Sequence, residues 1–180
     1  MSDLGKLTYY LGIEVLQEKD GIMLRQESYV KKILAETGMS ECNYVLVPRE
    51  FGLELCKAKH EQSIDEKRYR RTIGCLRYLL HTRPDLSYPV GVLSRYLQEP
   101  RESHGVALKQ VLRYLRGTTS HGFYFKRGNK TGLVGFSDSS LSVDLDNGRS
   151  TAGHIFYFNE CPITWCFQKQ QVVALSFCEA

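Results

Sequence analysis

The strongest constraint on the fold is a helical periodicity in the middle of the chain, between residues 69 and 125. Apolar residues recur there at steps of three and four, which places them on one face of a helix. Pro84, Pro100 and Gly117 interrupt the pattern at points where helices end. The pattern predicts three short helices packed on one another through the apolar positions Tyr69, Ile73, Leu76, Leu80, Leu86, Val90, Leu93, Leu97, Val111, Leu112 and Leu115.

The segment before these helices has a different pattern. Residues 7–16 and 22–25 are rich in β-branched, aromatic and other apolar residues, and the turn signal Lys19-Asp20-Gly21 between them predicts a β-hairpin. Residues 28–37 predict a helix that ends at Gly38. Residues 41–63 have no sustained period, so we expect a linker there.

The segment after residue 130 predicts strands. Residues 133–136 have the pattern of a buried strand that ends at Ser137-Asp138, and residues 150–158 and 162–167 predict two further strands. Residues 170–180 are expected to lead into a helix. The sequence therefore predicts an α+β protein in which a hairpin and helix precede a three-helix region and an antiparallel sheet.

Composition limits the class of protein. Apolar residues make up 42% of the chain and charged residues 24%, as in soluble globular proteins, and no apolar run could cross a bilayer. The first residues show no signal-peptide pattern, and the six cysteines lack zinc-ribbon or redox spacing. We therefore expect an intracellular protein, in the cytoplasm or nucleus, with reduced thiols and no contact with membrane.

Positive charge is concentrated in the middle of the chain. Residues 57–130 hold 16 Lys and Arg against 6 Asp and Glu, a net charge of +10, whereas both flanking segments are acidic. Lys109, Arg113 and Arg116 form one stripe beside the leucine face of the third helix. Two interpretations remain open for this charge, namely a surface that faces nucleic-acid phosphates and an ordinary solvated helix face.

Several short motifs follow one another along nearly the whole sequence. They are YRRTIGCLRYL at residues 69–79, TRPDLSY at 82–88, LSRY at 93–96, VLRYLRGT at 111–118, RSTAG at 149–153, VALS at 173–176 and Glu179-Ala180. In this order they resemble the Pol polyproteins of copia-type LTR retrotransposons.

This resemblance implies three segments. Residues 1–63 would be the end of the palm and the thumb of a reverse transcriptase, residues 64–130 a helical connection, and residues 131–180 the truncated start of a ribonuclease H-like domain. The partners of a chain of this kind would be an RNA–DNA hybrid or duplex nucleic acid and the remainder of the Pol polyprotein. The candidate nucleic-acid contacts are Lys31, Lys32, Arg70, Arg71, Lys109, Arg113 and Arg116.

The ribonuclease H resemblance also implies a metal site. Hydrolysis in that family uses two Mg²⁺ ions held by carboxylates, and Asp138 matches the first metal ligand. Glu179 is only a neighbour of the next ligand, which would fall one residue beyond Ala180. After Asp138 the chain reads Ser-Ser-Leu-Ser-Val-Asp, so the tryptophan and second aspartate typical of the family are missing, and Asp138 as a turn-forming acid remains an alternative.

The polymerase resemblance lacks its catalytic residues. The family's paired aspartates would lie upstream, and the chain contains no Asp-Asp pair. Three hypotheses follow. The chain is a catalytically incomplete part of Pol, a nucleic-acid-binding module without sequence preference, or a component completed by another chain.

Overall fold

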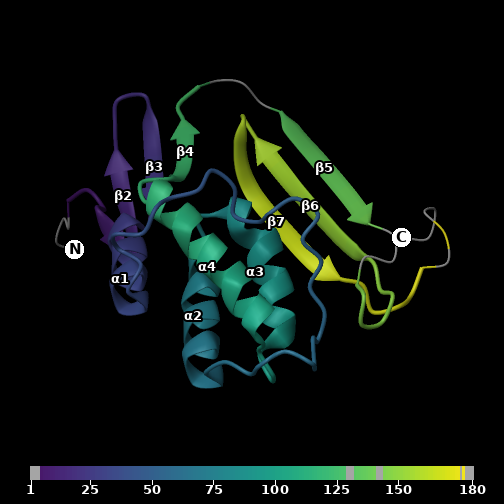
Figure 1. Ribbon diagram of the computed structural model, residues 1–180. Coiled ribbons are helices and arrows are strands. Elements are labelled where there is room, and N and C mark those ends of the chain that lie inside the picture. The colour runs from purple at the N-terminus through teal and green to yellow at the C-terminus, as the bar shows by residue number, and fades with distance from the viewer. Residues whose placement is uncertain (1–4, 129–131, 141–143, 175, 177–180) are drawn as a thin grey trace.

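The computed structural model describes residues 5–128, 132–140, 144–174 and 176. It is an α+β structure in which helices pack beside two separate antiparallel sheets (Figure 1). The helices are α1 (Glu27–Thr37), α2 (Glu66–Leu79), α3 (Ser87–Leu93) and α4 (Glu102–Gly117), with 3-10 turns at Pro84–Leu86 and Ser94–Tyr96. The strands are β1 (Tyr9–Tyr10), β2 (Ile13–Gln17), β3 (Gly21–Arg25), β4 (Gly122–Lys126), β5 (Leu133–Ser140), β6 (Thr151–Phe158) and β7 (Cys161–Lys169).

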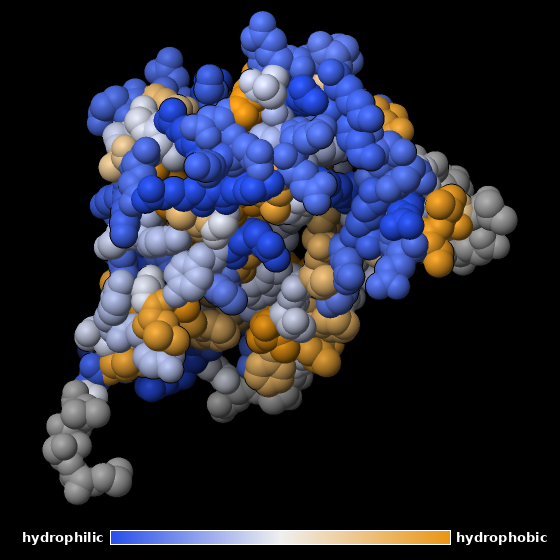
Figure 2. All heavy atoms as spheres, turned by 90° about the horizontal axis from the view of Figure 1, so that it is seen from below, coloured by the Kyte–Doolittle hydropathy of each residue, from blue (hydrophilic) through white to orange (hydrophobic). Residues whose placement is uncertain are grey.

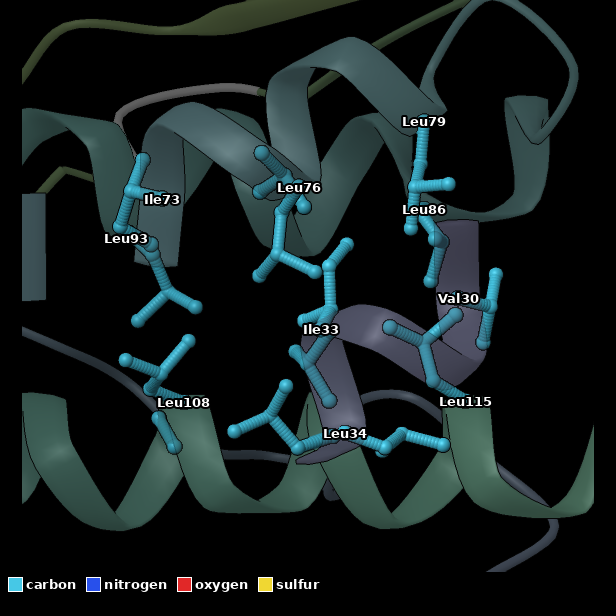
Figure 3. Close-up of a cluster of buried hydrophobic side chains, with 14 of the residues drawn as sticks. Val30, Ile33, Leu34, Ile73, Leu76, Leu79, Leu86, Leu93, Leu108 and Leu115 are labelled. Atoms are coloured by element: carbon cyan, nitrogen blue, oxygen red, sulfur yellow. The ribbon is translucent and has the colours of Figure 1, made fainter. Parts of the chain in front are cut away.

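The core is built by the apolar faces that the periodicity predicted. Side chains from α1, α2 and α4 point toward one another, together with Leu86 and Leu93 from the turn before α3 and from α3 itself (Figure 3). Ile73, Leu76 and Leu115 are fully buried in this cluster. Burying such side chains contributes about 1.5–3 kcal/mol each relative to exposure, so this cluster sets the positions of the helices.

The helix ends follow local signals. Asp65 caps α2 by accepting a hydrogen bond from the main-chain N–H of Arg68 at 3.1 Å. Gly38 ends α1 in the left-handed conformation, as expected from its position. Glu14 of β2 accepts the N–H of Ser28 at 2.8 Å, so a strand residue satisfies the first turn of α1.

The first sheet has four strands, whereas the sequence pattern predicted a hairpin of two. Its order is β1-β2-β3-β4, and β4 pairs antiparallel with β3 from Gly21 opposite Lys126 to Arg25 opposite Gly122. The sheet therefore joins strands that are nearly a hundred residues apart in sequence.

The expected single strand over residues 7–16 is wrong, because Leu11 and Gly12 interrupt it. Their φ angles are 45° and 79°, values that fit a tight two-residue turn between β1 and β2. The phenol of Tyr78 on α2 donates to the Leu11 carbonyl, and a Cβ on Gly12 would lie 3.2 Å from the Tyr78 hydroxyl oxygen. The glycine therefore allows the turn to approach α2 closely.

The second sheet has the order β5-β6-β7 and packs on the helices through β7. The Phe167 ring lies edge-on to Tyr88 of α3 with centroids 4.4 Å apart, and the Trp165 ring lies 4.9 Å from that of Phe123 on β4. The three predicted strands are present, but the expectation that the first of them is buried is wrong. Leu133, Val134 and Phe136 of β5 are exposed, since β5 is an edge strand and no described element covers it.

Three further expectations concern segments without regular structure. Residues 41–63 contain no helix or strand, as expected for a linker, apart from an isolated bridge between Ser63 and Arg101. Residues 170–174 are not helical, and most of the helix expected after them lies outside the described residues. No helix in the described part of the chain is long and apolar enough to cross a membrane.

Candidate nucleic-acid interface

Helix α2 presents a continuous basic surface on the side opposite its buried residues. We call this surface the α2 basic face and define it by Lys67, Arg70, Arg71, Gly74 and Arg77, all of which are exposed. At 100° per residue these five positions span roughly 120° of the helix surface. The face follows from the sequence because Tyr69, Thr72, Ile73 and Leu76 occupy the buried side.

Two arginines of this face are held in place by neighbours. Arg70 pairs with Glu66 one turn earlier and donates from Nε to the Leu97 carbonyl at 2.7 Å. Arg71 pairs with Glu36 of α1 at 3.0 Å while 74% of its side chain stays exposed. Each guanidinium group is therefore positioned by at least one neighbour and keeps donors that remain accessible to a ligand.

The remaining positions of the face carry no such restraint. The side chains of Lys67 and Arg77 form no hydrogen bond or ion pair with any residue that the structure describes. A Cβ added to Gly74 would meet no atom within 4 Å, so packing within the chain does not explain a glycine there. Figure 2 views the molecule from the end where α2 begins and shows a mainly hydrophilic surface with small hydrophobic patches.

The stripe expected on α4 is partly used by the linker. Arg113 donates from Nε to the Asn43 carbonyl at 2.8 Å, and Arg116 donates to the Ser40 carbonyl. Gln110 donates to the Val47 carbonyl at 3.1 Å. Linker carbonyls without a strand or helix partner need donors, and these side chains supply them. Lys109 is exposed and makes no such contact with the described residues.

The lysines expected on α1 lie on its surface. Lys31 forms an ion pair with Glu27 at 2.6 Å, one turn earlier, and Lys32 is exposed. Exposed pairs of this kind contribute at most about 0.5 kcal/mol. Neither lysine is fixed by tertiary contacts, so both resemble an ordinary solvated helix surface more closely than Arg70 and Arg71 do.

The candidate metal ligand Asp138 is not part of a carboxylate cluster. It lies near the end of β5, opposite Gly153 of β6, and is exposed; the strand continues two residues beyond it, to Ser140. The described residues hold no group of three or more His, Cys, Asp or Glu side chains that could bind a metal ion. A single carboxylate does not fit the ligand set of a two-Mg²⁺ site. Glu179 lies outside the described residues.

One buried carboxylate, Asp144, was not identified from the sequence. Its side chain is 2% exposed and accepts from Arg95 at 3.0 Å and from Lys169 of β7. It also accepts main-chain N–H groups of its own turn, at Asp146 and Asn147. Burial by itself would raise the pKa of Asp144, but the bonds from Lys169, its own turn and Arg95 hold the pKa below its usual range. The Asp-x-Asp-Asn-Gly spacing is a turn signal that could have identified it.

Comparison with known proteins identifies relatives of the chain. The family described as reverse transcriptase (RNA-dependent DNA polymerase) matches residues 1–51. The retrovirus-related Pol polyprotein from transposon RE2 of Arabidopsis thaliana is 41% identical over 174 residues, covering 97% of this chain and 12% of that protein. The corresponding protein from transposon RE1 of the same plant is 39% identical over the whole chain and 12% of its own length. The chain belongs to the Pol polyprotein family of copia-type retrotransposons.

The chain thus spans about 12% of the length of these two Pol relatives. It is also 34% identical to the uncharacterized mitochondrial protein AtMg00810 of Arabidopsis thaliana, of which it covers 74%. No solved structure matches the chain. The family implies a divalent metal in the intact reverse transcriptase.

Proposed function

We propose that this segment of Pol holds duplex nucleic acid or an RNA–DNA hybrid by its phosphates, without reading base sequence. The α2 basic face is the central contact in this proposal. Further candidate contacts are Lys31, Lys32, Lys109, Arg113 and Arg116. Membership of the Pol family and the net charge of +10 over residues 57–130 support a nucleic-acid ligand.

The observation that carries the proposal is the glycine in the middle of the α2 basic face. A glycine inside a helix costs about 0.8–1.0 kcal/mol of helix stability relative to alanine, and Gly74 offers no packing benefit in return. Cations lie around it at Arg70, Arg71 and Arg77. A helix surface without a side chain at its centre lets a sugar–phosphate backbone approach the main chain between those cations.

We further propose that the catalytic carboxylates of Pol come from outside this segment, in the same polyprotein or in another chain. The chain contains no Asp-Asp pair, and Asp138 is a single exposed carboxylate. Purified chain should therefore show neither primer extension nor cleavage of RNA in a hybrid. Hybrid cleavage that disappears in Asp138→Asn would contradict this proposal.

The salt dependence of duplex binding tests the proposed phosphate contacts. Each phosphate that is neutralised contributes about 0.9 to the slope of log affinity against log salt on B-form DNA. Replacing Arg70, Arg71 and Arg77 by Gln should flatten that slope by up to about 2.7. Binding should also be similar for duplexes of unrelated sequence, since phosphate contacts carry no base information.

A matched control removes the same charge elsewhere. Lys19, Lys126 and Arg127 are exposed near the ends of β2 and β4, away from the start of α2 (Figure 1). Their replacement by Gln should change the slope much less than the α2 variant does. Equal effects of the two triple variants would mean that net charge, rather than the α2 basic face, drives binding.

A further inference from the structure

A second surface suited to an anionic ligand lies between the helices and the second sheet. It is a cleft of about 660 Å³, bounded by the last turn of α2, by α3 and by the edge strand β7. That volume is within the range of small-molecule sites, about 300–1,000 Å³. We call it the sheet cleft. Its lining residues are Arg77, Leu80, His81, Ser87, Val90, Gly91, Ser94, Ile163, Thr164, Trp165, Cys166 and Phe167.

The charged groups of the sheet cleft are all potential cations. Arg77 and His81 line it on the α2 side, and none of the lining residues is Asp or Glu. Arg77 also belongs to the α2 basic face, so the two surfaces are continuous. A strand held along α2 by its phosphates can thus enter the cleft without crossing an acidic residue.

The inner wall of the sheet cleft offers hydrogen-bonding groups. Ser87 and Ser94 of the α3 region line it, and the Ser87 Oγ has no hydrogen-bond partner among the described residues. Buried hydroxyls are normally paired, because an unpaired one costs about 1–3 kcal/mol. The Ser87 Oγ is shielded from solvent, so a ligand group in the cleft would provide the missing partner only after this side chain turns toward the cleft.

The opposite wall is aromatic. Trp165 and Phe167 of β7 line the cleft, and each is fixed by a ring on another element, Trp165 by Phe123 and Phe167 by Tyr88. Fixed aromatic walls next to cations bind unpaired bases by stacking, which contributes about 1–3 kcal/mol per base. A paired duplex would hold its bases away from such a wall.

We propose that the sheet cleft binds an unpaired nucleic-acid strand, with a phosphate at Arg77 and His81 and a base against the β7 aromatic wall. This inference rests on the proposed function, since the α2 basic face delivers the strand to the cleft. It assigns the cleft a different ligand from that of the α2 face, namely the single-stranded end of a duplex.

Trp165 reports on the cleft directly because it is the only tryptophan of the chain. Titration with a short oligothymidylate should change its fluorescence emission, whereas a blunt DNA duplex should bind with little change. In the double variant Arg77→Gln with His81→Gln, the emission change should be lost. Affinity for the oligothymidylate, measured by anisotropy of a labelled strand, should fall about tenfold or more, as expected for losing a stacked base and its phosphate contact.

The matched control is Lys67→Gln, which removes a cation from the α2 basic face at the opposite end of the helix. It should weaken duplex and single strand to a similar, smaller extent and preserve the emission change. Oligothymidylate binding without any change in Trp165 emission would overturn the cleft proposal and leave the duplex proposal intact. An emission change that survives the double variant would also overturn the cleft proposal. If an added peptide then produced the same emission change, the result would favour a peptide strand paired with the β7 edge as the ligand. Failure of both nucleic acids to bind would overturn both proposals.

Discussion

At the scale of single residues, the most deeply buried charge of the helical region, Arg83, holds two of its turns together. Arg83 is 2% exposed and donates to both carboxylate oxygens of Asp85, to the Thr118 carbonyl and to the Thr118 hydroxyl. Tyr114 also donates to Asp85 at 2.9 Å. The TRPD motif therefore ties the turn before α3 to the end of α4, which is a structural role.

Asp85→Asn should destabilise the fold at neutral pH. Burial alone would raise the pKa of Asp85, but the bonds and charge of Arg83 hold the pKa below its usual range. The carboxylate thus contributes stability that is fully present above its unfolded pKa of about 3.9 and is lost as the pH falls below that value and through the lower pKa of the folded state. Urea unfolding should give a loss of about 1–3 kcal/mol at neutral pH. The difference between variant and parent should shrink in acid, and a constant difference would contradict the charge argument.

The protonation of the buried residue His104 also affects the stability of the fold. Its Nδ1 accepts the Arg101 N–H at 2.8 Å, and Nε2 lies 2.9 Å from the Cys56 carbonyl, an arrangement that the neutral imidazole satisfies. The ring stacks on Tyr96 at 4.0 Å. Burial lowers the pKa of His104, although Glu61 and Asp146 act in the opposite direction and Arg101 in the same one.

The lowered pKa predicts a loss of stability in mild acid. The unfolded chain takes up a proton at about pH 6.5, where the folded chain does not, so stability rises with pH through that region and falls below it. Chemical unfolding at about pH 7.5 and 5.5 should show this dependence for the parent and a weaker one for His104→Gln. His121→Gln removes an exposed histidine and should keep the parental dependence. An unchanged dependence in His104→Gln would contradict the assignment.

At the scale of elements, α4 organises the irregular linker. Gln110 and Arg113 donate to the linker carbonyls of Val47 and Asn43, and Arg116 donates to the carbonyl of Ser40, directly before the linker. Tyr44 lies against Gly117, where an added Cβ would be 3.1 Å from its side chain. One face of α4 thus packs in the core while the neighbouring face holds the linker.

Replacing Arg113 and Arg116 by Gln should release the linker. Chymotrypsin should then cut faster after Tyr44 and Leu46, which are already exposed. Global stability should change by no more than about 1–2 kcal/mol, since the lost bonds are near the surface. Lys109→Gln is the control, because Lys109 makes no bond to the linker. Equal cleavage rates in all three proteins would show that these bonds do not hold it.

Sequence patterns predicted some of these elements better than others, for physical reasons. The helices were predictable because each apolar face repeats over several turns, as from Tyr69 to Leu76. Strand β4 was missed because five residues give no period of their own, and pairing with β3 decides their conformation. Arg113 and Arg116 donate hydrogen bonds to carbonyls far away in sequence, and Arg95 and Lys169 pair with Asp144, which is also distant from them in sequence. No local sequence pattern contains such long-range contacts. The basic residues of α2 were recognised, but the role of Gly74 needed the space around it.

At the scale of the whole molecule, Asp144 joins the second sheet to the helices. It links Arg95, next to α3, with Lys169 on β7, and Arg95 also donates to the Thr151 hydroxyl at 3.0 Å. Asp146 of the same turn accepts the Lys57 N–H of the linker at 3.0 Å. This turn thus contacts both the helical region and the linker.

Asp144→Asn should loosen the second sheet while the helical core stays folded. The change leaves two cations without their carboxylate, at a cost of about 2–3 kcal/mol after allowance for their partial exposure. Hydrogen exchange should therefore quicken in β5–β7 and stay slow in the buried part of α2. Asp146→Asn, which removes a more exposed carboxylate from the same turn, should have a smaller effect. If hydrogen exchange quickened equally in the sheet and in the helices, the two would not open separately.

The most direct test of the central claim, that α2 meets a nucleic-acid backbone at its glycine, is the variant Gly74→Ala. No atom outside the neighbouring backbone of α2 lies within 4 Å of the new methyl group. The free energy of unfolding should therefore rise by about 0.8–1.0 kcal/mol, and the variant should unfold at a higher denaturant concentration. If a phosphate backbone approaches this point, affinity for duplex should fall even though the protein is more stable. We predict this opposite movement of stability and affinity in one protein. A variant that gains stability and binds duplex as tightly as the parent would contradict the account.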